Sequence, residues 1–95
     1  MQVRWTSKAL SDLVRLHAYL ANVNKPAGAG IVKSLSAAPA GLLANPRIGE
    51  KLEEFEPAEV RRILVGQYEM RYEMRYEIVE STMYVLRLWH TRENR

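Results

Sequence analysis

The side chains best suited to chemistry in this 95-residue chain are arginines and one histidine in its C-terminal third. Arg61 and Arg62 are adjacent, Arg87 follows in a later apolar run, and His90 and Arg92 lie close to the last residue. Guanidinium groups hold phosphates and carboxylates through paired hydrogen bonds. A histidine can transfer protons near neutral pH. These residue types indicate a site for an anionic partner.

The same side chains also have structural explanations. Arg71 and Arg75 alternate with glutamates, a pattern typical of a cross-strand charge ladder in which each pair contributes only tenths of a kcal/mol. For His90 we prefer a structural or hydrogen-bonding role over a catalytic one. His17 falls at a helix boundary and needs no chemical role.

Several kinds of site are excluded by composition. The chain has no cysteine and two histidines, which excludes disulfides, thiol nucleophiles and cysteine-based zinc sites, and nearly excludes a histidine-rich metal site. It also has no phosphate-binding loop and no nucleophile triad. We therefore expect neither a metal nor a cofactor.

Length and composition indicate one globular domain over residues 1–95. Apolar residues make up 47% and charged residues 26% of an 11.0 kDa chain, which is ordinary for a folded protein. No apolar run is long enough for a membrane span or a signal peptide, so we expect a cytoplasmic protein with no membrane partner. The net charge of +3 suits nucleic acid or an acidic protein equally.

The first half of the chain predicts a strand followed by a helical hairpin. Residues 2–6 alternate as in a strand, and Thr6 or Ser7 can cap a helix ending near residues 22–24. Its expected core stripe is Leu10, Leu13, Leu16 or His17, and Leu20, with Lys8, Asp12 and Arg15 elsewhere.

A second helix is predicted from Pro26, with a core stripe formed by Ile31, Leu35, Ala38, and Leu42 or Leu43. Pro39 lies inside this pattern and predicts a kink or break near Ala37. The glutamate-rich residues 50–59 then predict a solvated connector.

From Val60 onward the apolar residues recur at every second position, which predicts an antiparallel sheet. Turns are expected at residues 66–67 and 80–81, with a last strand over residues 83–89. In the long run between these turns, one row should face the helices: Tyr68, Met70, Tyr72, Met74, Tyr76 and Ile78. The other row should face outward: Glu69, Arg71, Glu73, Arg75 and Glu77. The fold class is α+β, in the order β-α-α-β-β-β, with a helical hairpin on one face of a small antiparallel sheet.

Within this run the four residue types Tyr-Glu-Met-Arg occur twice, at residues 68–71 and 72–75. Because four is even, the repeat preserves which side chains face inward, but it lengthens the strand by roughly 13 to 14 Å. The extra length must overhang, bulge or pair with another chain. We expect either a homodimer or strand exchange through residues 68–75, or simply a longer hairpin.

Motifs along nearly the whole chain resemble the RelE/ParE toxin superfamily of bacterial toxin-antitoxin modules. They are Trp5, Ala9, the Asp12-Leu13 pair, the NPRIG of residues 45–49, RRILVGQY of residues 61–68, RYEI of residues 75–78 and VLRLWHTR of residues 85–92. The resemblance implies the fold described above, a cognate antitoxin as partner, and a role in growth inhibition or plasmid stabilisation.

Two activities occur within the superfamily. RelE-like members cleave messenger RNA on the ribosome, which would place Arg61, Arg62, His90 and Arg92 in a catalytic site. ParE-like members inhibit DNA gyrase, with Arg87, His90, Arg92 and Arg95 then as target contacts. No tyrosine or further basic segment follows Arg95 and the strand face lacks lysine, so the ParE-like branch is favoured. A member that only binds an antitoxin is a third alternative.

The antitoxins of such systems carry an acidic, amphipathic tail, for which a basic groove between hairpin and sheet would be a receptor. The candidate contacts are Arg15, Lys33, Arg61, Arg62, Arg71 and Arg75. Strand addition at a sheet edge is the other option.

Overall fold

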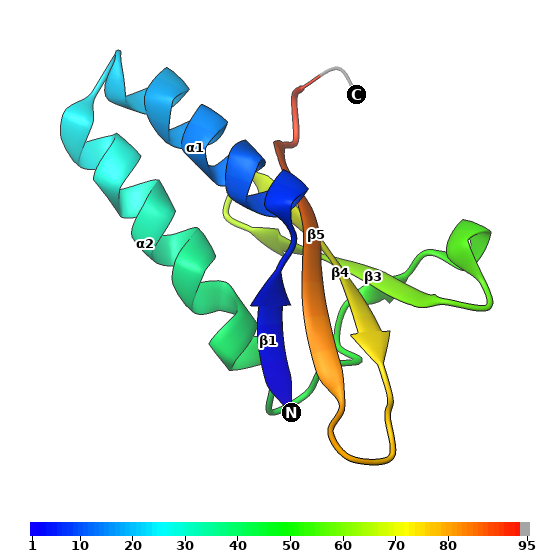
Figure 1. Cartoon of the computed structure of the whole chain (residues 1–95). Helices are drawn as coiled ribbons and strands as arrows, with labels where there is room; N and C mark the ends of the chain where they lie inside the picture. The colour runs from blue at the N-terminus through cyan, green and yellow to red at the C-terminus, as the bar shows by residue number, and fades with distance from the viewer. Residues whose placement is uncertain (94–95) are drawn as a thin grey trace.

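The computed structural model describes residues 1–93 as two layers, a helical hairpin on one face of a five-stranded sheet (Figure 1). Along the chain the elements are β1 (Gln2–Trp5), α1 (Ser7–Ala21), α2 (Lys25–Leu42), β2 (Glu50–Lys51), the 3-10 helix η1 (Glu53–Phe55), β3 (Glu59–Val65), β4 (Tyr68–Arg75) and β5 (Thr82–His90). The predicted α+β class and element order are confirmed, and β2 and η1 are added within the predicted connector.

The sheet is mixed, with strand order β1-β5-β4-β3-β2. β1 pairs in parallel with β5, while the other neighbours are antiparallel. The prediction of a wholly antiparallel sheet was therefore wrong for one strand. The short turns after β3 and β4 fix the directions of three strands, but β1 joins at the far edge, where no turn constrains it.

Both helices begin at side-chain caps. The Thr6 hydroxyl accepts a hydrogen bond from the Ala9 amide at 3.1 Å and also lies 3.0 Å from the Val85 and Leu86 carbonyl oxygens. Asn24 caps α2 by accepting from the Ala27 amide at 3.2 Å. Thr6 therefore fixes the start of α1 against β5.

The buried side of α1 differs from the predicted stripe. Ala9, Asp12 and Leu16 are buried, whereas Leu10 is 49% exposed. The predicted stripe is confirmed at Leu16, which is buried, and at Leu13, which packs against the core. It was wrong for Leu10 and for Asp12, whose burial through specific hydrogen bonds an apolar pattern does not register.

The predicted stripe of α2 is confirmed at Leu35 and Leu42, which are buried. The helix continues through Pro39 to Leu42, so the predicted break did not occur. Pro39 lies in the last turn, where a missing amide removes a single hydrogen bond, and its ring is buried in the core.

The core lies between the helices and the sheet. Met70, Tyr72 and Met74 of β4 are buried as predicted, and each fully buried side chain of this size stabilises the fold by about 1.5 to 3 kcal/mol. Tyr76 and Ile78 lie beyond the strand and are exposed. The chain between β4 and β5 spans residues 76–81, longer than the predicted tight turn. The two-residue turn between β3 and β4 is confirmed, with Gly66 at φ 60°.

The repeated segment is accommodated inside the sheet. β4 is paired along both edges, with β3 and with β5, and its register with β5 shifts between Arg71 and Tyr72, where the two copies meet. Arg71 pairs with Arg87 and Tyr72 with Val85, so β5 bulges at Leu86. Both edges of β4 are thus paired within one chain and offer no edge for strand addition by another copy, and exchange of residues 68–75 between two copies stays a prediction.

Within residues 1–93, neither helix has the length and apolar character needed to cross a membrane.

Candidate functional site

A hollow of about 630 Å³ lies between α1 and the ends of β4 and β5 where those strands meet the C-terminal segment. Its apolar part comes mainly from α1, and its polar part from the residues that follow β5. The lining residues are Arg15, Leu16, Tyr19, Leu20, Tyr68, His90, Arg92 and Glu93. The hollow thus brings together His90 and Arg92, predicted as catalytic or target contacts, and Arg15, predicted as an antitoxin contact.

The His90 ring has partners at both nitrogens. Its Nδ1 accepts a hydrogen bond from the Arg92 amide at 3.1 Å, so Nε2 carries the proton of a neutral ring and donates to the Gln67 side-chain oxygen at 3.2 Å. The ring also meets Tyr68 edge-on at 5.1 Å between centroids. These contacts hold the β3–β4 turn against the C-terminal segment, which supports the structural interpretation of His90.

Arg15 ties this C-terminal segment to α1. Its guanidinium lies 2.8 Å from the Glu93 carboxylate, whose other oxygen accepts a hydrogen bond from the His90 amide at 3.0 Å. Burial alone would raise the pKa of Glu93, but the hydrogen bonds from the His90 amide and Arg15 outweigh it and lower that pKa. Residues 90–93 are therefore fixed along the rim of the hollow.

Asp12 is the buried carboxylate behind this arrangement. It accepts hydrogen bonds from Arg87 at 2.8 and 3.2 Å and from the Leu88 amide at 2.9 Å. β1 pairs only with residues 82–85 of β5, so the Asp12 carboxylate takes the place of a strand partner at Leu88. Burial acts to raise the pKa of Asp12, but these hydrogen bonds and the charge of Arg87 lower it overall.

Arg61 holds the loop before β2 in place through hydrogen bonds. It donates to the Gly49 carbonyl oxygen at 2.8 Å and to the Glu59 carboxylate at 2.9 Å, and its side chain is 15% exposed. On the same loop, the Tyr72 hydroxyl donates to the Pro46 carbonyl oxygen at 2.7 Å and accepts from the Gly49 amide at 3.2 Å. The NPRIG motif is thus held by a buried tyrosine and an arginine.

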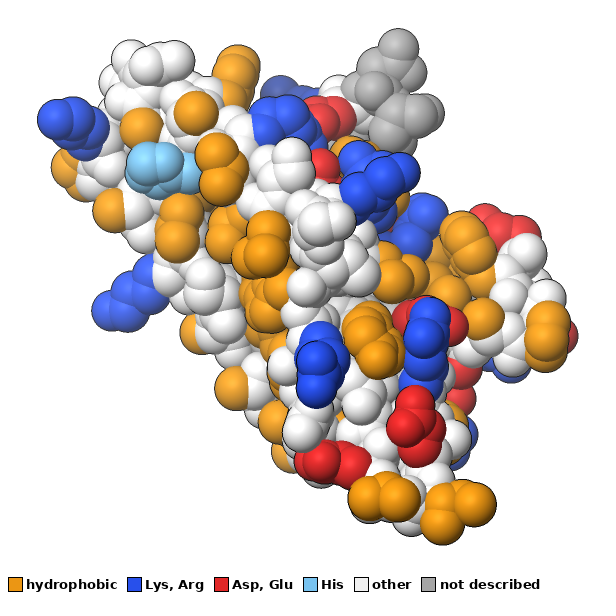
Figure 2. Space-filling view, in the orientation of Figure 1, with side chains coloured by type: hydrophobic (Ala, Val, Ile, Leu, Met, Phe, Trp, Pro, Cys, Tyr) orange, Lys and Arg blue, Asp and Glu red, His pale blue; other side chains and the backbone are white. Residues whose placement is uncertain are grey.

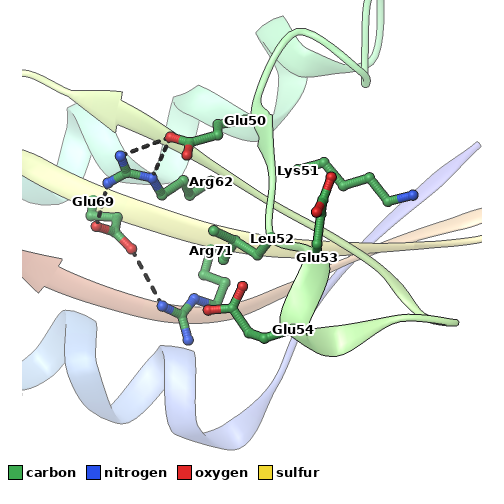
Figure 3. A pocket seen from close by; sticks show the side chains of 8 residues that line it. All are labelled: Glu50, Lys51, Leu52, Glu53, Glu54, Arg62, Glu69 and Arg71. Carbon is green, nitrogen blue, oxygen red and sulfur yellow. Dashed lines mark hydrogen bonds and ion pairs between the residues drawn. The ribbon is translucent and has the colours of Figure 1, made fainter.

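Arg62 points to the opposite face of the sheet, into an open depression of about 590 Å³ beside η1 (Figure 3). It pairs with Glu50 at 2.8 Å and with the buried Glu69 at 3.0 Å, whose second oxygen lies 3.6 Å from Arg71. Glu69 thus lies on the outward face as predicted, but it is buried there because two arginines and the folded connector enclose it.

An alternating stack of rings and guanidinium groups crosses this outer face. The Arg71 guanidinium lies 5.2 Å from the Phe55 ring and 4.7 Å from the Trp89 ring, which also has Arg87 at 5.0 Å. Such cation–π contacts each stabilise by about 0.5 to 2 kcal/mol. The predicted connector is mostly exposed, as expected, and the Phe55 ring of η1 also fastens it to the sheet.

The residues predicted for a nuclease site are not brought together. Arg61 pairs with Tyr72 and His90 with Tyr68, which separates them by roughly 13 to 14 Å along β4. Arg62 lies on the other face. Of the four, only His90 and Arg92 share the hollow.

The predicted antitoxin contacts are spread over several surfaces. Arg15 borders the hollow and Lys33 is exposed on α2. Arg71 and Arg75 lie on the outer face, where Arg75 pairs with Glu73 at 3.2 Å and covers the Tyr84 ring at 4.6 Å. Arg95 lies outside the described residues. Sequence reasoning missed Asp12, although an acidic residue between Ala9 and Leu16 on an apolar helix face is the pattern that marks it.

A metal centre has no support in the described part of the chain, where no group of three histidine or acidic side chains is placed to bind an ion.

A two-helix hairpin on a five-stranded mixed sheet, with a C-terminal segment anchored beside α1, is a small two-layer α+β fold. A solved structure described as "Chromosomal ParDE TA system from P. aeruginosa" shares this fold, with a TM-score of 0.71 over 97% of each chain at 18% identity. No curated protein matches the sequence significantly. The family model for the ParE toxin of the type II toxin-antitoxin system parDE matches residues 3–95. The chain belongs to this ParE toxin family.

Proposed function

We propose that the chain is the toxin of a bacterial type II toxin-antitoxin module, that it acts in the cytoplasm, and that it inhibits DNA gyrase by binding. The observation that carries the gyrase assignment is the dispersal of the nuclease candidates in a chain of the ParE family. RNA cleavage through the 2′-hydroxyl requires a proton acceptor, cations and a proton donor around one phosphate. Arg61 and both nitrogens of His90 are instead engaged in holding the fold.

Gyrase supercoiling of a relaxed plasmid tests this proposal. Purified toxin at micromolar concentration should reduce supercoiling or trap cleaved DNA, and its cognate antitoxin should restore activity. The matched control is the same toxin mixed with antitoxin before gyrase is added. Full supercoiling in the presence of toxin alone would reject gyrase as the target.

We further propose that the antitoxin binds along the exposed side of α1. Leu10 and Val14 lie one helical turn apart, and both are exposed, by 49% and 68%. An acidic amphipathic tail can cover such an apolar pair with its own apolar side.

Replacing both apolar residues, in the variant L10E/V14E, should weaken the toxin–antitoxin complex about tenfold or more, because each loses buried apolar area and gains a repulsive charge. Isothermal titration calorimetry measures the affinity. Lys25→Glu, at the start of α2, is the matched surface control and should bind nearly as the parent chain does. An unchanged affinity of L10E/V14E would place the antitoxin elsewhere.

A further inference from the structure

The end of the hairpin between β4 and β5 exposes two apolar side chains completely. Ile78 and Val79 have relative exposures of 106% and 97%, and they lie between Glu77 and Glu80. Figure 1 shows this hairpin projecting beyond the rest of the sheet, and Figure 2 shows apolar side chains protruding at its end. We call residues 77–80 the hairpin tip. Its chemistry is that of an apolar pair flanked by carboxylates.

The hollow beside α1 has the complementary chemistry. Its apolar wall includes Leu16, Leu20 and Tyr68. Its rim carries Arg92 beside Arg15, whose guanidinium is paired with Glu93 at 2.8 Å. Arg92 is exposed, and no ion pair to it is found within residues 1–93. A volume of about 630 Å³ accommodates an aliphatic pair such as the one at the tip.

The two surfaces lie at opposite ends of the molecule. The hollow is at the start of β4 and the tip follows its end, so the eight residues of β4 separate them along a body 45 Å long. A tip therefore cannot reach the hollow of its own chain. Two copies arranged antiparallel can form both contacts at once, and the pair is then closed by a two-fold axis.

We propose that two copies of this chain associate by inserting each hairpin tip into the hollow of the other copy. Ile78 and Val79 pack against the apolar wall, while Glu77 and Glu80 approach Arg15 and Arg92. This association is distinct from the strand exchange predicted for residues 68–75, and it does not depend on what the toxin inhibits.

Light scattering coupled to size exclusion tests the association. The free chain should shift with rising concentration from 11.0 kDa toward twice that mass. The variant I78S/V79S should require at least about tenfold higher concentration for the same shift, because it removes the apolar contact. Both residues are fully exposed, so the variant should fold normally, and circular dichroism verifies this.

A charge exchange makes the pairing specific. E77K/E80K and R92E should each associate more weakly than the parent chain, whereas an equimolar mixture of the two should associate more strongly than either alone. In the mixed pair the altered tip faces the altered rim, and the other tip and rim both keep their original residues. Lys33→Glu alone, a charge reversal on α2 away from the hollow, is the control and should associate as the parent chain does.

A synthetic peptide of residues 76–81 gives a direct measure of the site. Added to the isotope-labelled I78S/V79S protein, it should shift the amide resonances of Tyr19, Leu20 and Tyr68. A chain that stays monomeric at every concentration, a dimer that I78S/V79S leaves intact, or a peptide that shifts none of these resonances would overturn the proposal.

Discussion

Asp12 connects α1 to β5 through one carboxylate. It binds the Arg87 side chain and the Leu88 amide of β5 and lies 3.4 Å from Arg15 of its own helix, and only 6% of its side chain is exposed. Removing it would leave a buried amide and an arginine without their acceptor, and such unsatisfied groups cost more than the net value of the hydrogen bonds themselves.

Asp12→Ala should therefore lower the free energy of unfolding by about 2 to 4 kcal/mol. Asp12→Asn should lose less, because its side-chain oxygen can still accept from the Leu88 amide. Urea unfolding followed by circular dichroism measures both, with Lys8→Ala on the exposed side of α1 as control. A loss below about 0.5 kcal/mol for Asp12→Ala, the range of ordinary surface substitutions, would contradict this role.

The lowered pKa of Glu59 predicts that the stability of the protein depends on pH. The hydrogen bond from Arg47 is the main cause that lowers its pKa to about 2; burial opposes this shift and Arg61 adds to it. A carboxyl whose pKa is lowered by folding stabilises the native state above its unfolded pKa, near 4.5, and this contribution disappears as pH falls through the folded value.

Glu59→Gln should consequently be less stable than the parent chain at pH 7, and the difference should shrink steadily between pH 4.5 and pH 2. Urea unfolding at a series of pH values follows the difference. Glu54→Gln on η1 serves as the control for removing one exposed charge. A difference that stays constant over this interval would show that Glu59 acts through something other than its charge.

At the scale of elements, the loop before β2 depends on a residue in the middle of β4. The Tyr72 hydroxyl bonds to both Pro46 and Gly49 from within the core. A Cβ at position 49 would lie 2.7 Å from the Arg62 carbonyl oxygen, so the close approach of loop and sheet requires glycine. This contact fixes where β2 begins.

Tyr72→Phe should destabilise the protein by about 1 to 3 kcal/mol, because it strands a buried amide and a carbonyl while preserving the ring. Tyr76→Phe removes a hydroxyl from a half-exposed ring and is the matched control. Thermal and urea unfolding compare the two variants. Equal stability of both would mean that the loop is held without the Tyr72 hydroxyl.

The features that sequence predicted are those set by neighbouring residues. The inward row at Met70, Tyr72 and Met74 follows from alternation, and the cap at Thr6 follows from side-chain chemistry at helix starts. These patterns are local, so they are visible without knowing which elements meet.

The features that were missed depend on contacts between distant segments. The bulge at Leu86 absorbs the repeat only because β5 has one residue more than β4, and Glu69 is buried only because η1 folds back over Arg62 and Arg71. The sequence predicted only part of the candidate site, because contacts between distant segments also decide which residues share it. His90 and Arg92 are close in sequence and share the hollow, whereas Arg61 is far from both.

At the scale of the whole molecule, most arginines form ion pairs within the fold, so little of the positive charge is left to bind a partner. Arg15, Arg61, Arg62, Arg71, Arg75 and Arg87 all contact carboxylates within the described chain. The surfaces left for partners are the apolar side of α1, the hollow and the hairpin tip. We therefore expect partner recognition to combine apolar anchors with a small number of charges.

We propose that this toxin acts on gyrase and cleaves no RNA. The most direct measurement assays one purified preparation for both activities, gyrase supercoiling of plasmid DNA and cleavage of messenger RNA on ribosomes. We predict loss of supercoiling with intact RNA. Cleaved RNA with normal supercoiling, abolished by His90→Ala together with Arg92→Ala, would contradict the account.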